Sequence, residues 1–204
     1  MAYLVLVRHG ESTFNAQGIW TGWQNPPLTE KGLEEAKKAG ELIKDIKFDF
    51  AFTSPLLRST QTFDEIVKTA GITVAPILAD EIKERNYGDY TGKNKWEIEK
   101  ELGEEKFKKL RRGFDVPIPN GETLKDVYNR VIPYFQTQIL PKLYDGKNVI
   151  ISAHGNSLRA LAKFLENISD EDISGVEIAT GQVIVYQIDS EGKVSSKDIR
   201  TTSS

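Results

Sequence analysis

The sequence predicts an α/β fold: a three-layer α/β/α sandwich with a mostly parallel sheet and a helical insertion over the C-terminal ends of the strands. Two observations carry this prediction. Short apolar runs alternate with amphipathic helical segments along the 204 residues, which is typical of βαβ units. Two of the apolar runs, residues 3–8 and 149–153, are each followed by a His-Gly pair, and these pairs contain the only histidines, His9 and His154.

The first half of the chain supplies the early strands and helices. After the strand at 3–8, residues 11–27 form a polar loop, and Thr29 is the expected N-cap of a helix. The inward face of this helix is expected to hold Leu33, Ala36, Gly40 and Ile43. Residues 50–53 are a second strand.

A second helix is predicted to follow at once, with Ser54 as its N-cap and Pro55 at its first position. Its inward face is expected to hold Leu57, Phe63, Ile66, Val67 and Ala70. Residues 74–78 form a short third strand.

The composition changes at about 84–121, where Lys, Glu, Gly and aromatic residues are frequent, and this segment is the predicted insertion. Residues 123–143 then resume an amphipathic helix, which Pro133 should kink or interrupt. A strand, a helix at 157–165 and a last core strand at 183–188 precede a polar tail. We expect a single domain over 1–204.

Composition excludes several classes of function. The net charge of −3 gives no global basic field that would attract nucleic acid or a membrane surface. The absence of cysteine excludes disulfides and thiolate chemistry. The N-terminal apolar run is too short for a signal peptide, and no stretch approaches the ~20 apolar residues of a membrane helix. We expect a cytoplasmic protein without nucleic-acid or membrane partners.

His9 is the first candidate for chemistry, because Arg8 stands beside it at a strand end. The carboxyl ends of strands are where ligands bind in open α/β sheets. A neighbouring cation lowers the pKa of an imidazole, which keeps it neutral and nucleophilic near pH 7. For a lone histidine, a structural role in the core is the simpler interpretation. The matching strand end at His154 reverses that preference.

Two helix starts lie close to these strand ends in the sequence. Arg58 falls in the first turn of its predicted helix, where a cation opposes the positive end of the helix dipole. An anion bound between Arg58 and Arg8 would remove this conflict. Ser157 begins a helix just after His154, so free N–H groups there could point at the same anion.

Two further clusters favour an anionic ligand. Residues 84–88 place Glu84, Arg85 and Tyr87 in a glycine-bounded turn, and Glu84 is suited to general acid/base work. Arg111 and Arg112 end a basic run, which is either a solvated helix face or a bidentate clamp for a carboxylate or phosphate. No Walker A loop, dinucleotide fingerprint or nucleophile elbow is present, and two histidines without a carboxylate motif predict no metal site.

Together these residues resemble the histidine phosphatase superfamily, and within it the branch of cofactor-dependent phosphoglycerate mutases. The resemblance begins with Leu-Val-Arg-His-Gly-Glu-Ser at residues 6–12 and runs in order along nearly the whole chain. The matching segments are 6–12 with Asn15, 21–23, 28–32, 53–58, 84–88, 92–95, 111–113 and 153–159.

This resemblance implies interconversion of 2- and 3-phosphoglycerate, in glycolysis and gluconeogenesis, through a phosphohistidine primed by 2,3-bisphosphoglycerate and without a metal. It implies that His9 is the nucleophile, Glu84 the general acid/base, and Arg8, Arg58, Asn15 and His154 the groups around the phosphoryl. The implied substrate-binding residues are Arg8, His9, Gly10, Ser12, Asn15, Thr21, Gly22, Arg58, Glu84, Arg85, Tyr87, Lys95, Arg111, Arg112, Gly155 and Asn156.

Two alternatives remain beside the mutase: a phosphatase that passes the phosphoryl group from His9 to water, and a scaffold that only binds phosphorylated ligands. Lys95 and the Arg111–Arg112 pair favour the mutase, because they suit a small polyanionic acid held away from water. The segment 113–123 is shorter than in longer mutases of the branch, which removes surface used for subunit contacts. We therefore expect a monomer or a small homo-oligomer.

Overall fold

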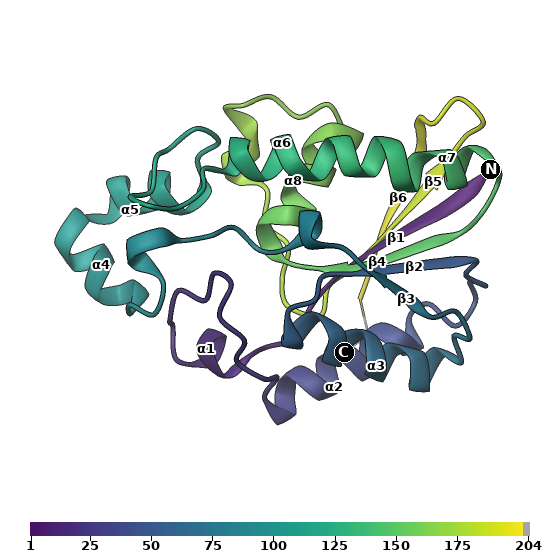
Figure 1. The fold of residues 1–204 in the computed structure, drawn as a ribbon, viewed down its shortest axis with the longest axis horizontal. Helices are drawn as coiled ribbons and strands as arrows, with labels where there is room; N and C mark the ends of the chain where they lie inside the picture. Colours follow the sequence, from purple (N-terminus) through teal and green to yellow (C-terminus); the bar gives the residue numbers. More distant parts are fainter. Residues whose placement is uncertain (202–204) are drawn as a thin grey trace.

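A mixed sheet of six strands lies at the centre of the computed structural model, which describes residues 1–201 (Figure 1). The strand order is β3-β2-β4-β1-β5-β6, and the pairs from β3 to β1 are parallel, whereas β5 is antiparallel to both β1 and β6. The strands are β1 (Ala2–Arg8), β2 (Phe50–Thr53), β3 (Pro76–Leu78), β4 (Val149–Ala153), β5 (Val183–Ile188) and β6 (Val194–Arg200).

Helices cover both faces of this sheet, as predicted: α2 and α3 on one side, and α6, α7 and α8 on the other (Figure 1). The helices are α1 (Thr13–Ala16), α2 (Glu30–Glu41), α3 (Leu57–Ala70), α4 (Lys95–Leu102), α5 (Glu104–Arg112), α6 (Leu124–Tyr134), α7 (Leu140–Tyr144) and α8 (Gly155–Leu165). Short 3₁₀ turns occupy Asp80–Ile82, Gly88–Tyr90 and Asp172–Gly175. No helix of the described residues is both long and apolar enough to cross a membrane.

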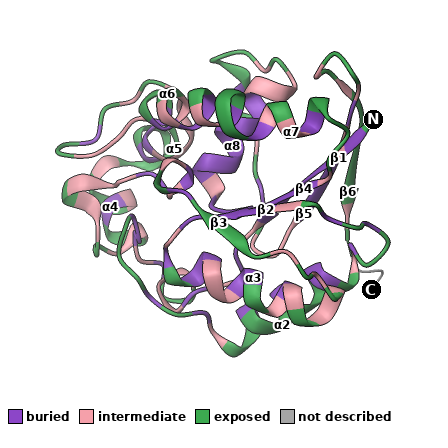
Figure 2. Ribbon diagram, turned by 45° about the vertical axis from the view of Figure 1, so that its right-hand side comes forward, coloured by how far each residue is buried: buried purple, intermediate pink, exposed green. Residues whose placement is uncertain are grey.

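The core forms two layers because successive side chains of a strand point to opposite faces. In β1, Leu4 and Leu6 join the cluster under α6 and α8, while Val5 and Val7 join the cluster over α2 and α3. All four are fully buried, and Figure 2 shows the buried central strands between more exposed helices. The sheet is thus a rigid support for the residues that follow the ends of its strands.

The register of the central strands sets the position of both histidines. β1 and β4 are parallel neighbours, and Arg8 lies opposite Ala153 in their pairing. His9 and His154 each follow directly, so they leave the sheet side by side at its carboxyl edge. Helices α4 and α5 of the predicted insertion lie beyond this edge (Figure 1). They have their own small core, formed by Trp20, Ile98, Phe107, Leu110 and Ile118.

Three details of the predicted helices are wrong. Helix α3 begins at Leu57 with Leu56 as its N-cap, so Ser54 does not cap it and Pro55 is not its first residue. Leu33 and Leu57 are 38% and 39% exposed, although their spacing suggested inward faces. The helix predicted at 157–165 begins two residues earlier, at Gly155.

The C-terminal elements also differ in part. The polar tail contains an edge strand, β6, whose residues 195–199 are exposed. Residues 202–204, the end of the predicted 1–204 domain, lie outside the described residues. Strand β3 is confined to Pro76–Leu78, shorter than predicted. Pro133 does not interrupt the helix where it stands, because it lies inside α6; the irregularity begins two residues later, where a π-helical segment, Phe135–Ile139, separates α6 from α7.

Candidate active site

The two histidine rings lie together, as predicted, with their centroids 5.1 Å apart. His9 Nδ1 is 2.7 Å from the carbonyl oxygen of Gly10, which can only accept, so Nδ1 carries the ring proton. His9 Nε2 therefore has a free lone pair. In this structure it accepts a hydrogen bond from Arg58 Nε at 3.2 Å. The backbone thus fixes the tautomer in which Nε2 is unprotonated.

His154 is held differently. Its Nε2 lies 2.6 Å from the hydroxyl of Ser54, and its Nδ1 is buried without a hydrogen-bond partner. Ser54, expected to cap α3, therefore orients the second histidine instead. The backbone N–H of His154 donates to Ser157 Oγ at 3.2 Å, which ties the ring's residue to the first turn of α8.

Gly10 follows His9 where the chain crosses α2 at close range. A Cβ on Gly10 would lie 2.1 Å from the carbonyl oxygen of Gly32, and one on Gly32 would lie 2.1 Å from that of Glu11. Only glycine fits at either position. The N–H of Gly10 also donates to Thr62 Oγ1 of α3 at 3.0 Å. The contacts of Gly10 thus fix the backbone next to His9.

A polar cavity of about 100 Å³ lies in front of His9. Twelve residues predicted for the site line it: Arg8, His9, Asn15, Thr21, Arg58, Glu84, Tyr87, Lys95, Arg111, Arg112, Gly155 and Asn156. They come from the end of β1, from α1 and the loop after it, from α3, from the insertion and from α8, so segments far apart in sequence meet here. Residues at the strand ends and from both helices of the insertion, α4 and α5, border the space.

Five predicted residues do not line the cavity. Gly10 follows His9 in the chain, and the His154 ring lies 5.1 Å from the His9 ring. Ser12 is the N-cap of α1, where its hydroxyl accepts from the N–H of Asn15 at 3.2 Å. The carbonyl of Gly22 accepts from Arg58 Nη2 at 3.0 Å. Arg85 is buried and donates to the carbonyls of Glu122, Leu110 and Val116. These contacts are structural.

Four lining residues were not predicted: Trp20, Arg159, Glu177 and Ile178. Arg159 belongs to the matching segment 153–159, so it could have been included. Glu177 and Ile178 lie in the loop before β5, where the sequence has no local signal for a site. Glu177 forms an ion pair with Arg112, and the carbonyl of Ile178 accepts from Arg8 Nη1 at 2.6 Å. This loop thus anchors two of the cavity's arginines.

The Glu84 carboxylate is fixed at the start of α8. Its Oε1 accepts from the N–H of Arg85 at 2.7 Å, from the N–H of Asn156 at 3.2 Å and from Asn156 Nδ2 at 2.9 Å. A carboxylate is favoured at a helix N-terminus, where N–H groups lack helical partners. At least one N–H group expected to face the ligand is therefore engaged by Glu84. The carboxylate's orientation is set before any ligand binds.

The side chain of Asn156 is itself oriented by Arg159. Arg159 Nη1 donates to Asn156 Oδ1 at 2.9 Å, and because a guanidinium can only donate, the amide NH₂ must face the other way. There it donates to Glu84 Oε1 and to the Tyr87 hydroxyl at 2.8 Å. Arg159 Nη2 also binds the carbonyl of Arg112 at 2.7 Å. The amide of Asn156 is held in one orientation.

Burial keeps both histidines neutral. Desolvation lowers the pKa of His9 well below 6.5, and the charges of Arg58 and Arg8 lower it further. The pKa of His154 is likewise lowered well below 6.5 by burial, with Arg58 next in importance. At pH 7 neither ring carries a proton on both nitrogens. His9 Nε2 is thus available as a nucleophile.

The cavity carries an excess of positive charge. Six cations line it, from Arg8, Arg58, Lys95, Arg111, Arg112 and Arg159, against the carboxylates of Glu84 and Glu177. Burial lowers the pKa of Arg58 to about 10, and burial followed by the charge of Arg111 lowers that of Lys95 to about 8. Buried nitrogens of Arg8, Trp20 and Arg159 have no hydrogen-bond partner. Such groups are rare, and an anion with several oxygens suits them.

The depressed histidine pKa values predict that stability falls as the solution is acidified below pH 6.5. Below pH 6.5 the two histidines bind protons in the unfolded chain but not in the folded chain. The free energy of unfolding therefore decreases by on the order of 1 kcal/mol per histidine for each pH unit of acidification. We expect this loss in urea unfolding between pH 6.5 and 5.5, in buffer free of phosphate. His9→Gln should reduce the slope. A free energy independent of pH in this interval would show that the rings are accessible to protons in the fold.

No group of three or more His, Cys, Asp or Glu side chains within residues 1–201 is arranged to hold a metal ion. The fold is an α/β sandwich whose sheet edge carries two histidines beside a cavity lined by six cations. The chain belongs to the histidine phosphatase superfamily (branch 1), whose family model matches residues 4–198.

Curated relatives are similar over nearly the full length. The chain is 46% identical to the 2,3-bisphosphoglycerate-dependent phosphoglycerate mutase of Nitrobacter hamburgensis, covering 95% of each protein. It is 45% identical to the phosphoglycerate mutase of Schizosaccharomyces pombe, covering 96% of this chain and 94% of that protein. Among solved structures, a mycobacterial glucosyl-3-phosphoglycerate phosphatase has the same fold, with a TM-score of 0.84, 18% identity and 98% coverage of both chains.

Proposed function

We propose that this enzyme interconverts 2-phosphoglycerate and 3-phosphoglycerate, with 2,3-bisphosphoglycerate as its primer. One observation carries the proposal: an unprotonated His9 Nε2 at the wall of a small cavity lined by six cations. The names of relatives at 43–46% identity support the same activity. The substrate pair implies a place in glycolysis and gluconeogenesis, in the cytoplasm.

In this proposal, His9 Nε2 attacks phosphorus in line with the departing oxygen. Its lone pair is directed by the Nδ1–H bond to Gly10, which also stabilises the ring when it becomes phosphorylated. The ligand would replace Arg58 Nε at Nε2, and Arg58 would then contact the phosphoryl oxygens. 2,3-Bisphosphoglycerate supplies the phosphoryl group that primes His9.

The transferring group needs charge stabilisation more than covalent chemistry. Arg8, Arg58 and Asn15 line the cavity, and the His154 ring lies 5.1 Å from the His9 ring. Arg8 is fixed by the carbonyl of Ile178, and Arg58 by those of Gly22 and Gln24 at 3.0 and 2.9 Å. Because these guanidinium groups are held before the reaction, little reorganisation is required as charge moves onto the phosphoryl oxygens.

Glu84 is proposed as the general acid/base for the substrate hydroxyls. Its Oε1 is occupied by three N–H donors, which leaves Oε2 to exchange a proton with the ligand. In the primed enzyme, the acceptor hydroxyl of the substrate takes the phosphoryl group from His9, and Glu84 removes the proton of that hydroxyl. His9 then takes the other phosphoryl group of the resulting 2,3-bisphosphoglycerate, and Glu84 returns the proton to the oxygen that departs.

The rest of the lining would hold the substrate's carboxylate and its non-transferring phosphate. Lys95, Arg111 and Arg112 supply the charges. Burial lowers the pKa of Lys95, and a bound anion would raise that pKa again. The neutral contacts are proposed from Thr21, Tyr87, Gly155 and Asn156. Gly10, Ser12, Gly22 and Arg85 are proposed to support this clamp through the contacts described above.

The experiment that tests this function is a coupled enolase assay with EDTA present. We expect conversion of 3-phosphoglycerate to 2-phosphoglycerate, stimulated by 2,3-bisphosphoglycerate and unchanged by the chelator. Inorganic phosphate is measured in the same reactions. Release of phosphate faster than isomerisation would assign a phosphatase, in which water takes the phosphoryl group from His9.

A further inference from the structure

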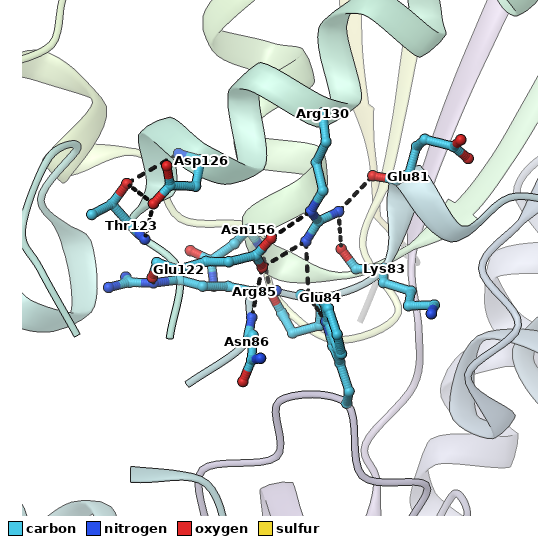
Figure 3. A network of polar contacts seen from close by, with 11 residues as sticks. Glu81, Lys83, Glu84, Arg85, Asn86, Glu122, Thr123, Asp126, Arg130 and Asn156 are labelled. Atoms are coloured by element: carbon cyan, nitrogen blue, oxygen red, sulfur yellow. Dashed lines mark hydrogen bonds and ion pairs between the residues drawn. The ribbon is translucent and has the colours of Figure 1, made fainter. Parts of the chain in front are cut away.

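Arg130 of α6 binds the backbone of the segment that carries Glu84 (Figure 3). Its Nη1 donates to the carbonyls of Glu81 at 2.5 Å and Lys83 at 3.0 Å, and its Nη2 donates to the carbonyl of Glu84 at 3.0 Å. Except for the 3₁₀ turn ending at Ile82, this segment has no regular structure of its own. One guanidinium group thus fixes three of its carbonyl oxygens.

Glu122 completes the arrangement from the other side of the guanidinium group (Figure 3). Arg130 Nε and Nη2 donate to its two carboxylate oxygens, at 2.8 and 3.0 Å. The same carboxylate accepts from the N–H of Asn86 at 2.8 Å, and the carbonyl of Glu122 accepts from Arg85 Nε at 2.6 Å. Both sides of Glu84 in the chain are therefore tied to the Arg130–Glu122 pair.

Helix α6 gives this pair a fixed support. Leu124, Val127 and Val131 are fully buried in the core under the sheet face, so the helix cannot shift without disturbing that core. Arg130 itself does not line the cavity. Arg130 can therefore affect the reaction only by setting the position of the segment that carries Glu84. Misplacement of a reacting group by about 1 Å can lower a rate ~10²-fold.

We propose that Arg130, oriented by Glu122, is a positioning residue that holds the Glu84 carboxylate in place for proton transfer. The inference rests on the role proposed for Glu84. The position of Arg130 requires a planar guanidinium group, because several donors in one plane must bind three carbonyl oxygens and a carboxylate. Lysine has the charge without the planar group, so it cannot bind three carbonyls and a carboxylate together.

A double-mutant cycle with Glu84 tests the proposal. We expect Arg130→Met to lower kcat about 10²-fold with little change in the KM for 3-phosphoglycerate, and Arg130→Lys to restore only a small part. In the Glu84→Gln background the same change should cost less than threefold, because the group that Arg130 positions no longer transfers a proton. A purely structural role predicts equal losses in both backgrounds, and that additivity would overturn the proposal.

Lys125→Met is the matched control, because Lys125 lies on the same helix and pairs with the exposed Asp115 at 2.8 Å, away from Glu84. It should leave kcat unchanged. If Arg130→Met does not fold, Glu122→Gln is used in the same cycle, with a smaller non-additive loss expected. The cycle is scored on whichever turnover the wild-type enzyme shows, isomerisation or phosphate release. Failure of the proposed function and failure of this inference are therefore distinguishable.

Discussion

His9→Ala is expected to abolish turnover, with a loss on the order of 10⁶-fold, the size seen when a covalent nucleophile is removed. The variant should also fail to take up acid-labile phosphate from 2,3-bisphosphoglycerate. The physical reason is that His9 Nε2 is the one imidazole nitrogen of the described chain with both a defined lone pair and a place on the cavity wall. Radiolabelled primer, followed by acid treatment and scintillation counting, measures the labelling.

His154→Ala is the matched control for this experiment. It removes the other buried imidazole, whose Nε2 is engaged by Ser54. We expect slower turnover from this variant but residual labelling, because the nucleophile remains. Label on His9→Ala at the wild-type level would show that another group forms the phosphoenzyme, and the assignment of His9 would be wrong.

Glu84→Gln is expected to keep the fold and the labelling but to slow turnover by 10²–10⁴-fold. The glutamine carbonyl can still accept from the N–H groups of Arg85 and Asn156, as Glu84 Oε1 does now. Its amide nitrogen, in the place of Oε2, cannot exchange a proton with a substrate hydroxyl. Rapid-quench kinetics separate phosphorylation of the enzyme from completion of the isomerisation.

Glu81→Gln is the control for that change, because Glu81 lies three residues earlier and does not line the cavity. It should behave as the wild type. If Glu84→Gln retains full turnover, the proton must come from another group, and Tyr87, which also lines the cavity, becomes the next candidate.

The central geometry could be predicted from the sequence because it depends on sheet topology. Two apolar runs that each end in His-Gly define two strand ends, and parallel strands bring their carboxyl ends to one edge of a sheet. The pairing of Arg8 with Ala153 confirms this for His9 and His154. The tautomer of His9 could not be predicted, since it depends on a backbone carbonyl whose direction only the turn at Gly10 sets.

Other features of the site depend on long-range contacts that no local pattern indicates. Ser54 has the sequence context of an N-cap, but in the fold its hydroxyl meets His154, one hundred residues away. Glu177 and Ile178 reach the cavity from a loop before β5. Arg130 looks like an ordinary charge on an amphipathic helix, and the contact behind the role proposed for it forms only because the chain near Glu84 passes α6.

A crystal structure of the enzyme with vanadate tests the central claim most directly, namely that both imidazoles and the surrounding guanidinium groups converge on one phosphoryl position. Vanadate adopts the five-coordinate geometry of a phosphoryl group in transfer. We predict vanadium bonded to His9 Nε2, with Arg8 and Arg58 on its oxygens and His154 beside it. Vanadate bound elsewhere, or in this cavity without contact to His9, would contradict the account.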